Sequence, residues 1–398
     1  MNNALVIAGG QWQVPLINFL KKKGYRVFVV DPYDNSLGVL AGDKHIKADV
    51  RDVELIFEQI NNTVFNIIIT DQSDISIETV ADLAQRFGIK SNQLKDVRKF
   101  SNKFISREYA KREGFPIPPY SIVRTVDDVE NFISENTPPI IIKPCDSQSS
   151  KGIHKLDNYN YKEVAAAIKD ALSYSQLDFC LAEKFVSGYE ITLEGYCSAG
   201  KHRTLATSKK SHFRTGIASI LSYPAVIPEE LERKIIAVNN NYIEKSGINF
   251  GITHAEYIVN ESTGDFYLIE IACRGGGTLI SSDIIKWVSG FDVYEALHSD
   301  LLGVETSNIK EINILKRNAI LHFFEFPEGK VKEIKGFDEI KMMDSVLEIS
   351  LNFSKGDTLK LALDDRGRQG FVILLTESLD EQNKKMEYIN KTLKIEYV

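Results

Sequence analysis

Short apolar runs alternate with stretches of helical periodicity over the first 100 residues. Predicted strands cover Ala4–Ala8, Arg26–Val30 and Asn66–Thr70. Apolar residues recur at helical spacing over Val14–Lys23 and Ile77–Phe87, and a glycine follows each stretch. Short buried strands that alternate with helices are typical of an open parallel α/β sheet.

The pattern changes after a proline-rich segment at residues 115–119, because clustered prolines end helices and mark a boundary or hinge. The middle of the chain has an α+β pattern, with predicted helices at Tyr161–Ala171 and Glu229–Ser246 and predicted strands at Ile140–Lys143, Phe179–Glu183, Ile191–Cys197, Asn249–Val259 and Asp265–Ala272. The C-terminal part is predicted to be β-rich, with strands at Asn318–Phe326, Lys330–Ile334, Ser345–Ile349 and Gly370–Leu375 and a helix at Leu379–Asn390.

Composition and charge narrow the function classes. A chain of 398 residues is too long for one compact core, so two or three domains are expected. The net charge of −7 provides no basic surplus for binding nucleic acid. No apolar run approaches about 20 residues, so no membrane-spanning helix is expected. The four cysteines form no CxxC pair, which argues against a zinc knuckle or disulfide framework and favours the reducing cytoplasm.

Two adjacent glycines, Gly9 and Gly10, follow the first predicted strand, and Asp31 ends the second. This layout invites a dinucleotide-binding interpretation, but the GxGxxG fingerprint needs three spaced glycines. The turn is therefore interpreted as scaffold or as part of a substrate-binding surface.

A lysine at the end of a very apolar strand is the first sign of phosphate chemistry. Lys143 follows three isoleucines, and a buried ammonium group needs an anionic partner. The partner is either an internal carboxylate or a phosphate. Lys103, in a predicted helix over Asn102–Arg112, is by itself an ordinary surface lysine.

The loop that follows Lys143 favours phosphate. Residues 146–152 are small, polar and flexible, and their hydroxyls and backbone N–H groups are suited to folding over phosphates. Taken alone, such a loop is equally compatible with an exposed hairpin turn.

Two glutamates, Glu183 and Glu190, bracket a short connector that contains Phe185 and Val186. The backbone of such a connector can bond the edge of an adenine ring while apolar side chains line its face. A carboxylate at its far end can accept both ribose hydroxyls. The alternative is a plain strand–turn–strand with two exposed glutamates.

A second pair of glutamates lies on consecutive predicted strands. Glu256 and Glu270 have apolar neighbours, and two such carboxylates repel each other unless a cation lies between them. Mg²⁺ bound by carboxylate and triphosphate oxygens is the natural occupant. Arg274 and three glycines follow, and an arginine here suits a transferring phosphoryl group.

In this order the motifs resemble an ATP-grasp enzyme of the carboxylate–amine ligase type, similar to L-amino-acid ligases and the ATP-grasp carboxylases of purine biosynthesis. The resemblance covers nearly the whole chain. It implies a pre-ATP-grasp α/β domain over residues 1–100, an ATP-grasp domain over 101–308 with a lid at about 120–187, and a C-terminal β-rich domain over 309–398.

The resemblance also implies the site. ATP is expected to contact Lys103, Lys143, Ser147, Ser149, Ser150, Gly152, Glu183, Lys184, Phe185, Val186 and Glu190. Mg²⁺, with Mn²⁺ as an alternative ion, is expected at Glu256 and Glu270, and catalytic roles at Arg274 and Lys209. Whether Lys209 or Lys210 faces the site stays open. The family usually has Asn two residues after the second metal glutamate, where this chain has Ala272.

The implied reaction converts a small carboxylate to an acyl phosphate, which an amine then attacks. A homodimer is one expectation, since dimers are frequent in the family. Three other interpretations stay open: a bicarbonate-activating carboxylase that uses the same site, a non-catalytic nucleotide-binding module, and a nucleotide-dependent oxidoreductase built on the Gly9–Gly10 turn.

Overall fold

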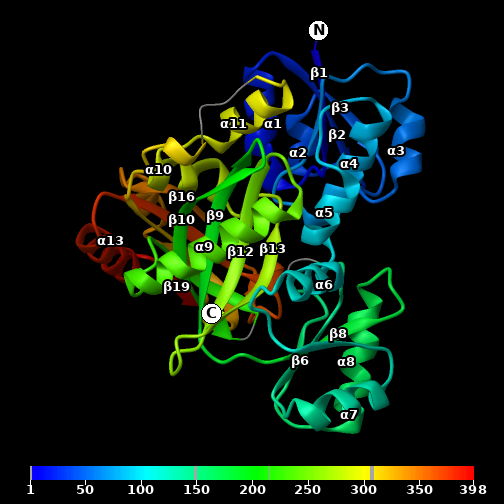
Figure 1. Cartoon of the computed structure of the whole chain (residues 1–398). Coiled ribbons are helices and arrows are strands. Elements are labelled where there is room, and N and C mark those ends of the chain that lie inside the picture. Colours follow the sequence, from blue (N-terminus) through cyan, green and yellow to red (C-terminus); the bar gives the residue numbers. More distant parts are fainter. Residues whose placement is uncertain (1, 148–149, 215, 305–308) are drawn as a thin grey trace.

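The computed structural model describes residues 2–147, 150–214, 216–304 and 309–398 (Figure 1). Its N-terminal part is a parallel sheet in the order β3-β2-β1-β4. The strands are β1 (Asn2–Ile7), β2 (Tyr25–Asp31), β3 (Lys44–Lys47) and β4 (Ile67–Ile69), and the helices are α1 (Val14–Lys22), α2 (Leu37–Ala41), α3 (Val53–Ile60) and α4 (Ile77–Arg86). The predicted parallel α/β sheet is confirmed.

A small lid projects from the rest of the molecule, in the lower right of Figure 1. Its antiparallel sheet has the order β5-β8-β6-β7 and packs its apolar face against two helices. The lid elements are β5 (Tyr120–Val123), α7 (Val126–Glu135), β6 (Ile140–Lys143), β7 (His154–Leu156), α8 (Tyr161–Ser173) and β8 (Cys180–Lys184). Helices α5 (Leu94–Ser101) and α6 (Lys103–Glu113) join it to the N-terminal part, and the 115–119 prolines lead from α6 into β5.

A long central sheet, in the order β13-β12-β9-β10-β11-β14-β18-β16, forms the body of the protein. Its strands are β9 (Tyr189–Ser198), β10 (Lys201–Arg214), β11 (Ile217–Tyr223), β12 (Gly251–Val259), β13 (Phe266–Ala272), β14 (Asn318–Phe323), β16 (Val346–Leu351) and β18 (Gly370–Thr376). Helix α9 (Glu229–Ser246) covers one face, where Tyr242 and Ile243 pack on Leu193 and Tyr257. Because side chains alternate along a strand, Glu190, Thr192 and Glu194 lie on the other face.

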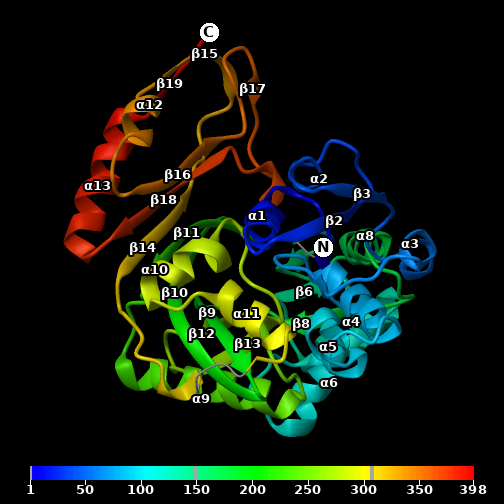
Figure 2. The ribbon, with the colours of Figure 1, turned by 90° about the horizontal axis from the view of Figure 1, so that it is seen from above.

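The C-terminal part continues this sheet and also forms a small antiparallel sheet of its own, in the order β17-β15-β19. Strands β14, β18 and β16 extend it beyond β11, as the view from above shows (Figure 2). The remaining C-terminal elements are β15 (Gly329–Lys335), α12 (Phe337–Lys341), β17 (Thr358–Leu359), α13 (Leu379–Thr392) and β19 (Lys394–Tyr397). Helices α10 (Ile285–Ser289) and α11 (Val293–Leu301) pack between the central sheet and the N-terminal part.

None of the helices within the described ranges is long and apolar enough to cross a membrane.

Candidate active site

A cleft of about 490 Å³ lies between the lid sheet and the central sheet. The volume falls in the range of small-molecule sites. The lid provides one wall through β6 and β8, and the exposed face of β9, β10, β12 and β13 provides the other. Of the predicted site residues, the cleft lining contains Lys103, Lys143, Ser150, Glu183, Lys184, Phe185, Val186, Glu190, Lys209, Glu256 and Glu270.

Lys143 has the internal carboxylate partner that the sequence left open. Its Nζ lies 2.7 Å from Oε2 of Glu183, and Nε of Arg107 lies 2.9 Å from Oε1 of the same carboxylate. All three side chains are at most 4% exposed. Burial lowers the pKa of Lys143 to about 8. The two cations hold the pKa of Glu183 at about 2 although burial raises it. Both oxygens of the Glu183 carboxylate thus have a cation partner within the protein.

The connector after β8 forms an apolar slot. Pro118, Ile141, Phe185 and Val186 line it. The amide of Phe185 donates to the carbonyl oxygen of Pro139 at 3.1 Å, whereas the Val186 amide has no hydrogen-bond partner among the described residues. A free amide beside apolar side chains suits the edge and face of a purine ring.

Lys210 lies between two carboxylates on the cleft face of the central sheet. Its Nζ is 2.6 Å from Oε1 of Glu190 and 2.8 Å from Oε1 of Glu256. Burial lowers the pKa of Lys210, but the two carboxylates outweigh this and raise it. Nε2 of His212 lies 3.3 Å from the other oxygen of Glu190.

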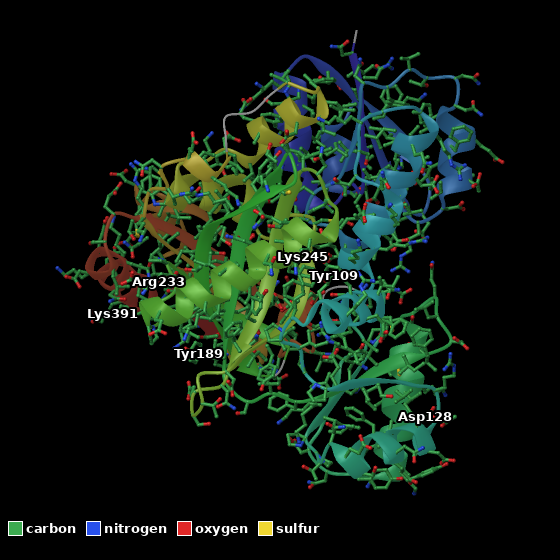
Figure 3. The ribbon with its side chains drawn as sticks, in the orientation of Figure 1. Tyr109, Asp128, Tyr189, Arg233, Lys245 and Lys391 are labelled. Carbon is green, nitrogen blue, oxygen red and sulfur yellow. The ribbon has the colours of Figure 1, made fainter. Side chains whose placement is uncertain are left out.

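The structure argues against Lys209 as the catalytic lysine. Successive residues of a strand point to opposite faces of the sheet. The ammonium group of Lys209 lies 4.5 Å from the centroid of the Tyr189 ring, and Tyr189 (labelled in Figure 3) packs toward the α9 side of the sheet. Both lysines line the cleft, but the ammonium of Lys210 reaches Glu256, so the geometry favours Lys210 and the catalytic role of Lys209 stays a prediction.

Glu256 and Glu270 lie opposite each other on β12 and β13. Oε1 of Glu256 is bonded by Lys210 at 2.8 Å and by His254 at 3.3 Å, and Oε1 of Glu270 is bonded by Lys103 at 2.9 Å. Oε2 of each glutamate has no partner in the described part of the chain. Each carboxylate thus keeps one free oxygen, which fits a divalent cation that also takes phosphate oxygens and water. Among the described residues, no group of three or more His, Cys, Asp or Glu side chains could hold a metal ion alone.

No sequence motif points to His254 or Glu194 as site residues. Nδ1 of His254 lies 2.6 Å from Oε1 of Glu194, a carboxylate that is 1% exposed. Burial lowers the pKa of His254, but Glu194 and Glu256 together raise it to about 10. His254 is the cross-strand partner of Ala272, so a cationic imidazole lies beside the position where the family usually has Asn.

The start of the polar loop is bonded by two cations from other parts of the chain. Lys103 Nζ donates to the carbonyl oxygen of Ser147 at 3.0 Å, and Arg51 of the N-terminal part donates to that of Asp146 at 3.2 Å. Gly152 has a φ of +71°, and an added Cβ would lie 3.0 Å from the Tyr174 ring. Ser149 lies outside the described residues.

Arg274 is held toward the N-terminal part. Its guanidinium group donates to both carboxylate oxygens of Asp74, at 2.9 and 2.6 Å, and Asp74 raises its pKa although burial lowers it. The next residue, Gly275, donates its amide to Asp71 at 2.7 Å. An added Cβ at Gly275 would lie 2.1 Å from that of Ser281, which explains why this position must be glycine. The contact of Arg274 with phosphate stays a prediction.

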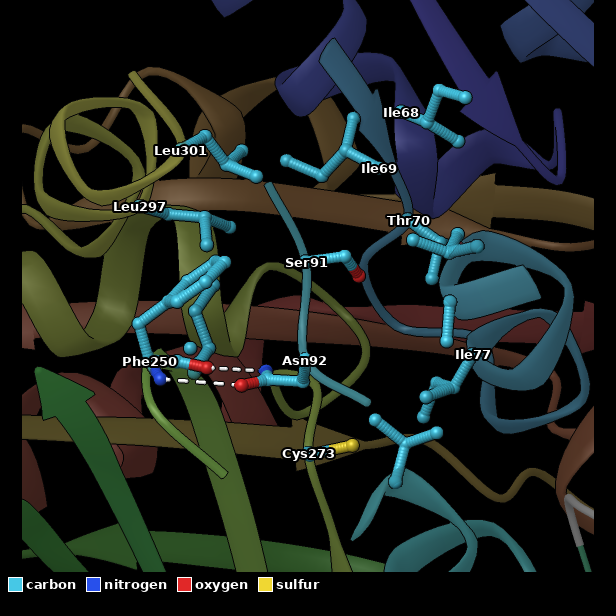
Figure 4. A pocket seen from close by; sticks show the side chains of 15 residues that line it. Ile68, Ile69, Thr70, Ile77, Ser91, Asn92, Phe250, Cys273, Leu297 and Leu301 are labelled. Carbon is cyan, nitrogen blue, oxygen red and sulfur yellow. Dashed lines mark hydrogen bonds between the residues drawn. The ribbon is translucent and has the colours of Figure 1, made fainter. Parts of the chain in front are cut away.

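A second, smaller pocket of about 70 Å³ lies where the N-terminal part meets the central sheet (Figure 4). Its lining is mainly apolar and includes Ile69, Ile77 and Cys273. Asn92 at its edge is already hydrogen-bonded to the backbone of Phe250, donating at 2.7 Å and accepting at 3.4 Å. Its size and apolar lining exclude a nucleotide site.

The lid, the cleft and the paired glutamates define a nucleotide-binding enzyme of the ATP-grasp fold. Two family models match the chain: "ATP-grasp domain" over residues 136–283 and "L-amino acid ligase C-terminal domain 2" over residues 322–398. The chain thus contains an ATP-grasp domain followed by an L-amino acid ligase C-terminal domain, and its matches to ligases support an ATP-dependent enzyme that forms C–N bonds.

Individual relatives agree with this class. An L-arginine-specific L-amino acid ligase from Bacillus subtilis is 24% identical over 327 residues, which cover 79% of this chain and 77% of the relative. The structure of an L-amino acid ligase from Bacillus licheniformis is similar with a TM-score of 0.83 at 19% identity, over 100% of this chain and 99% of that one. A biotin carboxylase from Campylobacter jejuni, solved as a β-γ-ATP complex, has a TM-score of 0.76 at 17% identity, over 99% and 92% of the two chains.

Proposed function

We propose that this protein joins a small carboxylic acid to an amine, with an amino acid as the default substrate and an amide or peptide bond as the product. ATP would be converted to ADP and phosphate through an acyl phosphate. The main observation in support is the pair of free oxygens on Glu256 and Glu270, set between Lys103 and Lys210 in a cleft with an apolar slot.

The residues fit ATP from one end of the cleft to the other. Adenine would occupy the slot of Pro118, Phe185 and Val186, with the free Val186 amide on its edge. Glu190 would accept the ribose hydroxyls once Lys210 and His212 release it. The triphosphate would meet Lys103, Lys143 and the polar loop around Ser147, Ser150 and Gly152. Glu183 would act by holding Lys143 in place.

Magnesium would be bound by Glu256 and Glu270 and, when present, would neutralise phosphate charge. The lysines of the cleft assist in the same way. A carboxylate oxygen of the acid attacks the γ-phosphorus, the bond to the bridging oxygen breaks, and ADP leaves. The amine nitrogen then attacks the acyl carbon, loses a proton, and phosphate leaves. No enzyme nucleophile is needed, because positioning and charge neutralisation suffice.

The lid has a physical role in this reaction. Water would hydrolyse an acyl phosphate, so the lid and polar loop must close over it. The 115–119 prolines between α6 and β5 would serve as the hinge.

The test measures nucleotide and phosphate products with Mg·ATP and pools of amino acids. ADP and phosphate released only when a carboxylate and an amine are both present support the proposal. Release of AMP and pyrophosphate would contradict the acyl-phosphate route. ATP turnover that depends on bicarbonate alone would point to carboxylase chemistry.

A further inference from the structure

One carboxylate of the cleft comes from the C-terminal part of the chain. Asp365 lies in a short 3₁₀ turn over Asp365–Gly367 between β17 and β18, and it lines the same cleft as Ser150 and Arg214. Neither the sequence motifs nor the proposed nucleotide contacts give it a role.

The other carboxylates of the cleft are already paired. Glu183, Glu190, Glu256 and Glu270 each lie within 2.9 Å of a lysine Nζ. Asp365 has no lysine partner among the described residues. Its Oδ1 is buried without a hydrogen bond and lies 3.4 Å from Nη1 of Arg368. A carboxylate with one cation beside it and a side chain that is 26% exposed can still accept a hydrogen bond from a ligand in the cleft.

Arg368 holds the turn in place. Its Nε donates to the carbonyl oxygen of Asp365 at 2.8 Å, and its guanidinium carbon lies 3.7 Å from the centroid of the Phe323 ring. A planar cation stacked on an aromatic face has little freedom. Arg368 therefore positions Asp365 at the edge of the cleft.

The C-terminal part is also fixed to the cleft wall. Arg214, near the tip of the β10–β11 hairpin, donates to both oxygens of Glu325 at 3.2 and 2.8 Å and to the carbonyl oxygen of Ala362 at 2.6 Å. The same hairpin tip approaches the polar loop, because a Cβ at Gly216 would lie 3.7 Å from that of Ser150. Asp365, three residues after Ala362, is thus in the part of the cleft lining that is fixed to this hairpin, whose tip approaches Ser150.

We propose that Asp365 binds the α-ammonium group of the amino acid whose carboxylate is phosphorylated, and that it thereby selects α-amino acids over simple carboxylic acids. The substrate carboxylate would point toward Glu256 and Glu270, and its ammonium group toward Asp365. This proposal rests on the proposed ligase function. The ammonium group takes no part in the bond changes and keeps its proton, so a carboxylate is the complementary group.

The experiment compares two acids that differ only in the α-amino group, such as alanine and propionate, as carboxylate donors with a fixed amine and Mg·ATP. The ratio of their kcat/KM values measures recognition of the ammonium group. Asp365→Asn keeps the shape of the side chain and removes its charge. The wild-type ratio is expected to favour the amino acid, and the variant is expected to lower it about tenfold to a hundredfold.

Asp338→Asn provides the matched control, because it makes the same change at an exposed position of α12 outside the cleft lining. Arg368→Gln is expected to lower the ratio less than Asp365→Asn does, and the double variant to be no worse than Asp365→Asn alone, since both act through one carboxylate. Binding of an ATP analogue by each variant verifies that the cleft is folded.

A wild-type enzyme that turns over but keeps its ratio in Asp365→Asn overturns the role of Asp365 and leaves the ligase function standing. A wild-type enzyme that gives no carboxylate-dependent ADP with any acid overturns the ligase function and this proposal with it.

Discussion

Glutamates on apolar strands line both walls of the cleft, yet they are used differently. In the lid, both oxygens of Glu183 are bonded by buried cations, Lys143 and Arg107. On the central sheet, Glu256 and Glu270 each have one oxygen bonded and one free. The comparison teaches that a fully paired carboxylate holds the wall together, whereas a half-paired carboxylate is presented to a ligand.

The largest expected effect tests the structural side of this comparison. Glu183→Ala leaves Lys143 and Arg107 buried as unpaired cations, which should lower the free energy of unfolding by about 3–5 kcal/mol. Chemical denaturation measures it. Glu135→Ala, at the exposed end of α7, should stay within about 0.5 kcal/mol of the wild type. Equal stability of both variants would show that the buried pair does not stabilise the lid.

Glu270→Gln tests the ligand-binding side. It removes the charge that faces the cation while the fold survives, and kcat should fall roughly a hundredfold to a thousandfold. Thermal melting verifies folding and ADP release measures turnover. Normal ADP formation by a well-folded variant would remove Glu270 from the metal site.

The third prediction concerns pH. The pKa of Lys143 is lowered by burial to about 8, so the ammonium loses its proton as pH rises through that value. Affinity for an ATP analogue should then fall, by up to about tenfold for each pH unit above 8. Calorimetry between pH 7 and 9 measures this fall. Lys143→Arg keeps the charge throughout and should flatten the profile. A fall of equal size in that variant would assign it to another group.

The last prediction compares two adjacent lysines, one of which has the smallest effect expected here. Lys210→Ala removes the cation between Glu190 and Glu256 and should lower kcat/KM for ATP about tenfold to a hundredfold. Lys209→Ala removes a stacking contact with Tyr189 worth about 1 kcal/mol at most, so turnover should change less than threefold. Steady-state kinetics of both variants decide between them, and the reverse ranking would restore Lys209 to the site.

The hydrophobic pattern alone predicted the helices and strands that have a clear periodicity. Helix α9 occupies the predicted Glu229–Ser246, and β1, α1 and α4 lie within a few residues of their predicted bounds. By contrast, β10 was not predicted, because its 14 residues include many polar side chains that face the cleft or solvent. Tertiary surroundings, rather than propensity, make this segment a strand.

The site residues also fall into two groups, those that the sequence predicts and those that only the tertiary structure reveals. The spacing around Lys143, Glu256 and Glu270 was sufficient to nominate them, since charged groups in apolar strands need partners. The pairing of Arg107 with Glu183 could not be predicted, because the two residues lie 76 positions apart in the sequence. The pairing of His254 with Glu194 spans 60 residues and depends on the register of β12 on β9. The choice between Lys209 and Lys210 needed the same knowledge of strand orientation.

The most direct test of the proposed acyl-phosphate mechanism is an ¹⁸O-labelling experiment. The acid substrate is prepared with ¹⁸O in its carboxylate and turned over with Mg·ATP and the amine. Attack of the carboxylate on the γ-phosphorus predicts one ¹⁸O atom in each phosphate released, with ADP as the other product. Phosphate without the label, or label in AMP, would contradict the acyl-phosphate mechanism.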